Sequence, residues 1–394
     1  MITLTESVVG ANAGRSRGHN RQVVLGRIRS AERIGRAEIA RASGLSTQAV
    51  SNIIADLLAD GLIVEGGHRA VSRGVPVVQY ALNPQGAFAA GIEIRPDAVF
   101  GALLNFCGEL VVERRRKVST NDRDGVIAAV RDMQARIFKG AGCDPTRLLG
   151  LGIVMPGPFG CTGIEGGASE LPIWDDTPPE VWLSERLGQP VLVENDANAA
   201  AIAERVSGAA QGLDSYGFLY FGVGLGLGMV HRGRLQAGAY GNAGEIGTLQ
   251  VPCDGKLVML EDVVSRRSLS EALRASGAAT QDVGDLARLY EAGDPALHRW
   301  LERTVEPLSA AISIVENLFD PQTIILGGAM PDNILDHMTE TIRLASRSVS
   351  NRAARQMPRL MRGASGRMTA TLGAAALVVN HAFTPKIAPQ PQEL

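Results

Sequence analysis

The stretch Val191 to Glu204, VLVENDANAAAIAE, decides how the rest of the chain is interpreted. It begins with three apolar residues and continues with three polar ones, Glu194, Asn195 and Asp196. The following segment, from about Ala197 to Ser207, is rich in alanine, which favours a helix. The pattern predicts a buried strand that ends in polar groups and leads into a helix. Because ligands bind at this end of the strands in open α/β sheets, we expect a ligand site here.

Two glycine-rich blocks follow this stretch. Tyr220 to Gly228 reads YFGVGLGLG, a strand that runs into glycines, and Gly241 to Thr248 reads GNAGEIGT. With VENDANAAAIAE, these blocks resemble the signature motifs of the ROK family of repressors, open reading frames and sugar kinases. Pro156-Gly157-Pro158 and the late block NLFDPQTIILGG are also similar to that family. The resemblance covers roughly residues 20–382, and the chain looks like the family's transcriptional regulators of the N-acetylglucosamine and xylose type.

Strands that alternate with helices after Phe88 place the body of the chain in the α/β class. The resemblance implies more: a two-lobed actin-like, ribonuclease H-like ROK body, with the ligand in the cleft between the lobes. An N-terminal winged helix-turn-helix is expected to precede it. We expect a flexible arm at residues 1–18, the winged helix-turn-helix at 19–82, a linker at 83–87, the ligand-binding body at 88–382 and a disordered tail at 383–394.

Charge is unevenly distributed along the 394 residues, whose net charge is −2. Residues 1–82 contain ten arginines and six acidic residues, a balance of +4, which leaves −6 for the remainder. A basic N-terminus on an acidic body indicates that only the N-terminal part meets phosphate. The four cysteines lie far apart and suggest no disulfide framework. No apolar run has the length of a signal peptide or a membrane span, so we expect a cytoplasmic protein without membrane contact.

The segment Arg36 to Asp60 predicts two helices joined by a short turn. Gly44 ends the first helix, and Ser46 is a candidate N-cap of the second. This arrangement is typical of a helix-turn-helix, although a helical hairpin with a solvated polar face has the same pattern. The local positive charge favours the first interpretation, with double-stranded operator DNA as the partner. The expected DNA contacts are short hydrogen-bonding side chains at the start of the second helix: Thr47, Gln48, Ser51 and Asn52.

Two strands, LIVE and VPVVQYAL, flank the loop Gly66 to Gly74 and predict a wing. Arg69 and Arg73 lie in or beside this loop, where they are expected to reach phosphates or a minor groove. ROK repressors often carry Gly-Arg-Pro here, whereas this chain has Ser72-Arg73-Gly74-Val75-Pro76. Reading a two-fold operator requires a homodimer or a dimer of dimers, which we expect for this protein.

The resemblance also implies a site for a sugar-like effector. In ROK sugar kinases the aspartate matching Asp196 acts as general base toward a sugar hydroxyl. Asn195 supplies a donor and an acceptor, and Glu245 and Glu261 match two further sugar-binding carboxylates. A single Asp after a strand is more often a helix cap. A sugar site is therefore expected only because these residues occur together. Thr248 stands where the family usually has histidine. The expected ligand-binding residues are Asn195, Asp196, Glu245, Thr248 and Glu261.

The family's zinc segment, CxCGxxGCLE, is reduced to VPCDGKLVMLE. Only Cys253 is present, and Met259 stands in place of the last cysteine. Structural zinc requires about four Cys or His ligands. We therefore expect no zinc and no other cofactor.

The first phosphate loop of the family's kinases, DxGGT, is also altered. Here the chain reads Glu93-Ile94-Arg95-Pro96-Asp97, in which Pro96 lacks an N–H and no glycine permits close approach to a phosphate. Val223 replaces the threonine of the second loop. We expect no kinase activity and no catalytic residue, with Asp196 catalytic only if the protein is a kinase. Two alternatives stay open: an active sugar kinase with an added DNA-binding domain, and a regulator controlled by a protein partner.

Overall fold

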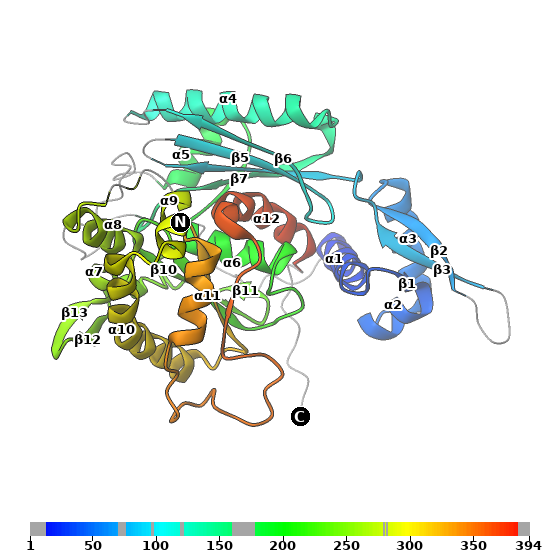
Figure 1. Cartoon of the computed structure of the whole chain (residues 1–394). Coiled ribbons are helices and arrows are strands. Elements are labelled where there is room, and N and C mark those ends of the chain that lie inside the picture. Colours follow the sequence, from blue (N-terminus) through cyan, green and yellow to red (C-terminus); the bar gives the residue numbers. More distant parts are fainter. Residues whose placement is uncertain are drawn as a thin grey trace.

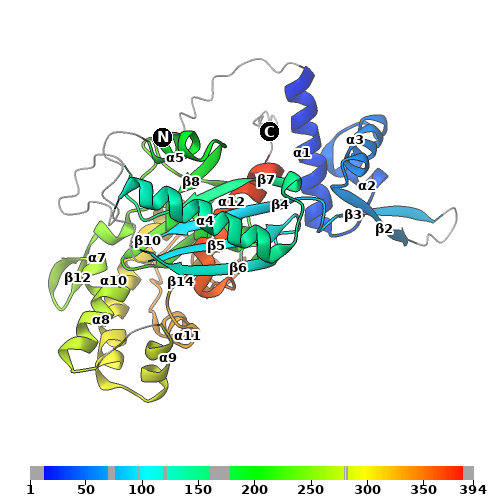
Figure 2. The same cartoon turned by 90° about the horizontal axis from the view of Figure 1, so that it is seen from above.

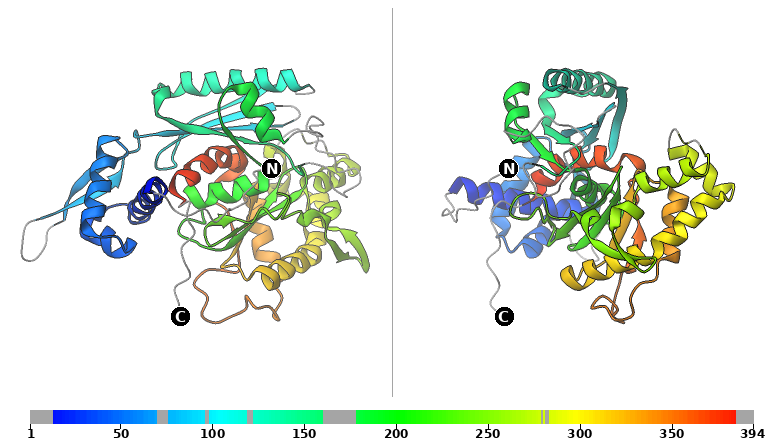
Figure 3. Two further views of the ribbon diagram at one scale, coloured as in Figure 1. Left: turned by 180° about the vertical axis from the view of Figure 1, so that it is seen from behind. Right: turned by 90° about the vertical axis from the view of Figure 1, so that its left-hand side faces the viewer.

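The computed structural model describes residues 13–69, 76–95, 98–118, 122–159, 178–278, 280 and 283–384. Its N-terminal unit projects from one side of a larger body, as Figures 1 and 3 show. The unit contains three helices, α1 (Ala13–Ala31), α2 (Arg36–Ser43) and α3 (Thr47–Ala59). It also contains an antiparallel sheet in the order β1-β3-β2, formed by β1 (Ile34–Gly35), β3 (Val77–Leu82) and β2 (Ile63–Arg69).

Local sequence signals explain the helix boundaries of this unit. Gly44 has a φ of 70° and ends α2, because glycine alone adopts this conformation without strain. The side chain of Ser46 accepts a hydrogen bond of 3.2 Å from the amide of Ala49 and caps α3. Both features were predicted. The expected arm was too long, because α1 already begins at Ala13; Arg17 in this added turn forms an ion pair of 2.6 Å with Asp56 of α3.

Two five-stranded mixed sheets form the body and share one plan: an antiparallel part is joined to a parallel part. The first sheet has the order β6-β5-β4-β7-β8, and β4, β7 and β8 are parallel. The second has the order β11-β10-β9-β14-β15, and β9, β14 and β15 are parallel. The strands of the first sheet are β4 (Phe88–Ile94), β5 (Ala98–Asn105), β6 (Leu110–Lys117), β7 (Leu148–Val154) and β8 (Val191–Glu194). Those of the second are β9 (Tyr216–Phe221), β10 (Leu225–His231), β11 (Arg234–Leu235), β14 (Ile324–Gly328) and β15 (Leu360–Arg362).

Helices α6 (Asp196–Ser207) and α12 (Thr369–Phe383) pack against each other between the two sheets. Small residues permit this close packing. A Cβ atom on Gly152 of β7 would lie 1.8 Å from the carbonyl oxygen of Ala374, and one on Gly373 would lie 2.2 Å from that of Ala199. The alanine-rich sequence of α6 therefore reflects contact with a helix, and not helix propensity alone. Helix α12 continues to Phe383, the first residue of the tail that was expected to be disordered.

The remaining helices cover the outer faces of the body. Figure 2 shows α4 (Arg123–Ala141) along the first sheet, with α5 (Pro179–Leu187) near its end. Beside the second sheet lie α7 (Leu260–Val263), α8 (Arg266–Ala275), α9 (Val283–Glu291), α10 (Pro295–Phe319) and α11 (Asp332–Thr341). None of the helices in the described ranges is long and apolar enough to cross a membrane.

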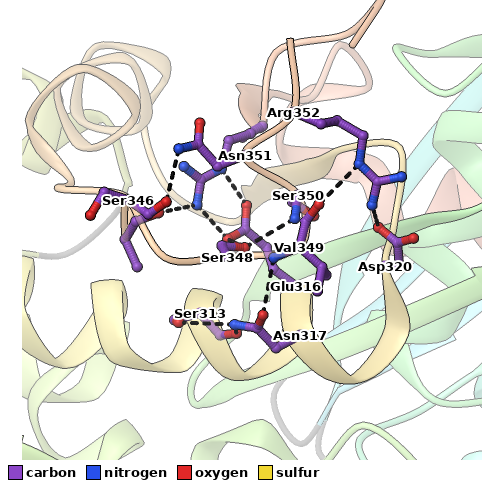
Figure 4. A network of polar contacts seen from close by, with 12 residues as sticks. Ser313, Glu316, Asn317, Asp320, Ser346, Ser348, Val349, Ser350, Asn351 and Arg352 are labelled. Atoms are coloured by element: carbon purple, nitrogen blue, oxygen red, sulfur yellow. Dashed lines mark hydrogen bonds and ion pairs between the residues drawn. The ribbon is translucent and has the colours of Figure 1, made fainter. Parts of the chain in front are cut away.

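The irregular segment between α11 and β15 is held to the end of α10 by polar contacts, which Figure 4 shows. The buried carboxylate of Glu316 accepts hydrogen bonds from Ser348 (2.7 Å) and from Arg359 (2.6 and 2.7 Å). Asn317 accepts a bond of 3.1 Å from the amide of Val349. A buried carboxylate is stable only when it is paired and hydrogen-bonded, as Glu316 is. The segment is therefore fixed without regular secondary structure.

The segment 83–87, expected as a linker, is a hydrogen-bonded turn. The amide of Gly86 donates to the carbonyl of Asn83 (2.9 Å), whose side chain donates to the carbonyl of Gly61 (2.7 Å). From the body, Arg147 donates to the carbonyl of Gln85 (3.1 Å). The connection is thus held from both sides.

Candidate ligand site and candidate DNA-binding surface

Asn195 and Asp196 lie where β8 ends and α6 begins, as the sequence predicted. The side-chain oxygen of Asn195 accepts a hydrogen bond of 2.8 Å from the amide of Asn198, so Asn195 is the N-cap of α6. One carboxylate oxygen of Asp196 accepts from the amide of Ala197 (2.9 Å). The cap role therefore belongs to Asn195, and the second oxygen of Asp196 faces the glycine loop. A Cβ on Gly222 would lie 3.2 Å from it.

The fold brings the other predicted carboxylates close to the same place. A Cβ on Gly157 would lie 3.5 Å from Cβ of Asn195 and 3.8 Å from a carboxylate oxygen of Glu245. Glu261 of α7 reaches the glycine loop, because a Cβ on Gly224 would lie 2.6 Å from its carboxylate. The PGP turn, the glycine loop and the GEIG block therefore meet, although they are far apart in the sequence. Such a group of oxygens can accept hydrogen bonds from a ligand with several hydroxyls.

The carboxylates are held where ionisation is costly. Burial, assisted by the neighbouring charge of Glu93, raises the pKa of Asp196 to about 7. Burial and then the charge of Glu261 raise the pKa of Glu245. A carboxyl with a pKa near neutrality exchanges a proton readily and can donate or accept a hydrogen bond. The arrangement suits either recognition of a hydroxyl or removal of its proton.

Thr248 is exposed, and its hydroxyl donates to the carbonyl of Glu245 at 2.7 Å. This bond stabilises the short turn after the GEIG block. Its contact with a ligand stays a prediction.

Sequence reasoning missed an ion pair at the altered first phosphate loop. Glu93 is buried, and its carboxylate accepts a hydrogen bond of 2.6 Å from Arg95 and another from Thr371 at the start of α12. Arg95 therefore balances the negative charge of Glu93. The alternation Glu-Ile-Arg was a usable signal, since residues two apart on a strand share a face. Pro96 and Asp97 lie outside the described residues.

The segment that resembles the family's zinc region is a β-hairpin of β12 (Gln250–Cys253) and β13 (Lys256–Met259). Asp254 and Gly255 form its turn with φ values of 50° and 74°, as the dipeptide Asp-Gly favours. Cys253 is buried in this hairpin. In the described part of the chain no group of three or more His, Cys, Asp or Glu side chains has a metal-binding arrangement. The absence of zinc stays a prediction.

The candidate DNA contacts lie at the start of α3. Thr47, Gln48 and Asn52 are exposed there, and Gln48 donates to Asn52 at 3.1 Å. Ser51 is half-buried and donates to the carbonyl of Thr47 at 2.8 Å. Gln48 and Asn52 therefore hold each other in place on an accessible surface.

Of the two predicted arginines of the wing, Arg69 lies within the described residues. Arg69 forms an ion pair of 2.9 Å with Glu38 of α2. Its guanidinium is therefore directed toward α2 of the same unit. Arg73 lies outside the described residues.

Helix α1 joins the N-terminal unit to the two helices between the sheets. Arg29 of α1 donates to the carbonyl of Val206 near the end of α6 at 3.0 Å, and its guanidinium lies 4.8 Å from the ring centre of Phe383 of α12. Gln22 donates to the carbonyl of His381 at 3.3 Å. The buried residues Val24 and Ile28 belong to the same apolar cluster as α6 and α12. The N-terminal unit is therefore packed on the body through α1.

Comparisons with known proteins agree with this geometry. The xylose repressor of Bacillus subtilis (strain 168) is 25% identical over 373 residues, which are 92% of this chain and 95% of the repressor. A glucokinase of Halalkalibacterium halodurans is 28% identical, over 73% of this chain and 92% of the glucokinase. A crystal structure described as a ROK family transcriptional regulator, homologous to the E. coli MLC protein, has a TM-score of 0.72 at 25% identity and covers 94% of this chain and 97% of its own. The model of the ROK family matches residues 89–381, and the chain therefore belongs to the ROK family.

Proposed function

We propose that this ROK protein is a DNA-binding transcriptional regulator, a repressor, whose body senses a sugar-like effector without phosphorylating it. The observation that carries the proposal is the combination of a retained carboxylate group at Asp196 with an ion pair, Glu93–Arg95, at the altered first phosphate loop. The extent of the alignments with relatives also favours a regulator over a kinase. The alignment with a protein named xylose repressor extends over 92% of the chain, whereas the alignment with a glucokinase covers 73%.

In this proposal residues 19–82 act as a winged helix-turn-helix. Helices α2 and α3 form the helix-turn-helix, α3 enters the major groove with Gln48 and Ser51 near base edges, and β2 and β3 form the wing. The positive balance of residues 1–82 supports contact with phosphate. A homodimer presents two such units to half-sites about one turn, or a multiple, apart.

Replacing Gln48 and Ser51 together with alanine tests the recognition helix. We expect the double variant to lose about 1–3 kcal/mol of binding free energy per base contact on the operator and much less on unrelated DNA. Fluorescence anisotropy with a fragment selected from random double-stranded DNA measures both. Exposed Arg27 on α1 gives a control, since Arg27→Ala should leave the preference for the operator unchanged. Equal losses on both kinds of DNA would count against α3.

Effector binding reaches the DNA unit through α6 and α12. Asp196 begins α6, and Thr371, which donates to Glu93, lies near the start of α12. The far ends of both helices contact Arg29 of α1. The segment 83–87 is also held by hydrogen bonds on both sides. A shift of α6 or α12 is therefore transmitted to the recognition helices. The coupling is expected to be about 1–3 kcal/mol, as in other allosteric proteins.

The second candidate, an ATP-dependent sugar kinase with an added DNA-binding domain, is favoured by one observation. A carboxyl with a pKa of about 7, such as Asp196, suits a general base at neutral pH. Incubation with sugars and ATP–Mg²⁺ separates the two. A sensor gives no sugar phosphate, and Asp196→Asn loses the effect of sugar on operator binding while the operator still binds. If the wild type forms sugar phosphate and ADP, and Asp196→Asn does not, the protein is a kinase and the sensor proposal is wrong. Operator binding that responds only to a protein would favour the remaining alternative.

A further inference from the structure

Two arginines from different parts of the body lie close to the candidate ligand site. Arg95 follows β4 of the first sheet, and Arg266 is the first residue of α8, beside the second sheet. Burial lowers the pKa of Arg266, and the positive charge of Arg95 adds to this decrease. Both arginines interact electrostatically with the buried side chain of Tyr220, whose pKa burial raises well above its usual value. The two positive charges are therefore near enough to repel each other.

The two arginines differ in their partners. Arg95 is paired with the buried carboxylate of Glu93 at 2.6 Å. Arg266 forms no ion pair with any carboxylate of the described ranges, and its buried Nε has no hydrogen-bond partner there. Removing a guanidinium from water without a partner costs free energy. An anion that binds Arg266 would supply the missing partner.

A cavity of about 230 Å³ adjoins Arg266. It lies between the glycine loop and α8, and its lining residues are Val223, Arg266, Arg267, Ser270, Glu271 and Arg274. Three guanidinium groups against one carboxylate make the lining basic. Ligand sites for drug-sized molecules begin at about 300 Å³, so this cavity fits a small acidic group better than a whole ligand.

Arg267 connects this cavity to the carboxylates. Its guanidinium lies 3.2 Å from the carboxylate of Glu261, and its amide donates to the carbonyl of Val223 at 3.1 Å. The same Glu261 carboxylate adjoins Gly224 and Gly247. A single ligand can therefore reach the acidic group of residues with its hydroxyls and the basic cavity with an anionic end.

We infer that the effector carries an acidic group, a phosphate or a carboxylate, which Arg266 and Arg267 bind in this cavity while its hydroxyls face Asp196 and Glu245. This inference rests on the proposed sensing function and narrows its ligand class to sugar phosphates and sugar acids. Arginine is suited to this role, because its planar fork forms two parallel hydrogen bonds with either group. A nucleotide also carries phosphate, but the altered first phosphate loop, with its Glu93–Arg95 pair, is poorly suited to it.

The test compares the wild-type chain with Arg266→Gln, and uses Arg343→Gln, an exposed arginine after α11, as the matched control. Isothermal titration and thermal unfolding are measured with inorganic phosphate, glucose, glucose 6-phosphate, glucuronate and ADP, at constant ionic strength. Loss of a hydrogen bond to a charged group costs about 1.5–3 kcal/mol, so Arg266→Gln should bind inorganic phosphate at least about tenfold more weakly. The control should bind it as the wild type does.

The inference also predicts that an acidic sugar binds the wild type at least about tenfold more tightly than glucose, and that Arg266→Gln removes this difference. Without ligand, Arg266→Gln should unfold at the same temperature as the wild type or higher, because a half-buried unpaired charge is lost. Phosphate binding that is absent, or equal in Arg266→Gln, would overturn the inference, as would preference for ADP over both acidic sugars.

Operator binding separates this inference from the proposed function. If glucose releases operator DNA and the acidic sugars act no better, the sensor stands and the acidic effector is wrong. If no sugar affects operator binding while phosphate binding still depends on Arg266, the anion site stands and the sugar sensor is wrong.

Discussion

The two ends of the central helices α6 and α12 differ in chemistry. At their N-terminal ends lie charged and polar side chains, Asp196 and Thr371, which face the candidate ligand site. At their C-terminal ends Val206 and Phe383 pack against α1 of the N-terminal unit. Between the ends, alanine and glycine bring the helices and sheets into direct backbone contact. We therefore propose that the N-terminal ends form a binding end and the C-terminal ends a reporting end, connected by the close-packed middle.

The largest effect should come from separating the middle of α12 from the sheet. In Gly152→Ala the new Cβ would lie 1.8 Å from the carbonyl oxygen of Ala374, so the backbone must move. We expect a loss of about 3 kcal/mol in the free energy of unfolding, measured by urea denaturation. Gly150→Ala on the same strand is the control, because its Cβ would meet only Val378 at 3.4 Å. Equal losses in the two variants would show that α12 is not held rigidly on β7.

Removing the charge at the binding end should change how stability depends on pH. The folded-state pKa of Asp196 is about 7, above its unfolded value of about 3.9, so the folded state binds the extra proton between these values. Its contribution to stability is present at low pH and is lost as pH rises from about 4 to 7. Asp196→Asn should therefore be more stable than the wild type at pH 8 and about as stable as the wild type at pH 4.

Chemical denaturation of both proteins at several pH values measures this difference. Exposed Asp60, at the end of α3, gives a control, since Asp60→Asn should not reproduce the pH dependence. A wild type that gains stability between pH 4 and 7 relative to Asp196→Asn would contradict the raised pKa.

The smallest effect is expected at the reporting end. Arg29→Ala removes the hydrogen bond to Val206 and the contact with the Phe383 ring. The variant should retain effector binding, while the change in operator affinity on effector binding decreases by about 1 kcal/mol, roughly fivefold. Anisotropy titrations with and without effector measure it, and Arg27→Ala on the exposed side of α1 is the control. Unchanged coupling in Arg29→Ala would show that Arg29 does not transmit the effect, and would leave the segment 83–87 and the other contacts of α1.

The sequence by itself determined the elements and the family. Gly44 and Ser46 fixed the turn before α3, and the change from apolar residues to Asn195 and Asp196 fixed the end of β8. Such signals are local, because a cap or a left-handed glycine acts on its immediate neighbours. The family motifs likewise identify Glu245 and Glu261 as candidate ligand residues.

Only the tertiary structure decided which of these residues meet and what balances their charges. The carboxylate of Glu93 accepts hydrogen bonds from Arg95 and from Thr371, which lies at the other end of the body in sequence. Arg266 lacks such a partner among the described residues. Burial sets the raised pKa of Asp196, and no sequence pattern reports it. The contact of Arg29 with α6 and α12 also depends on long-range packing. The physical reason is that burial and charge pairing depend on residues brought together by chain folding, whereas capping and turns depend on adjacent residues.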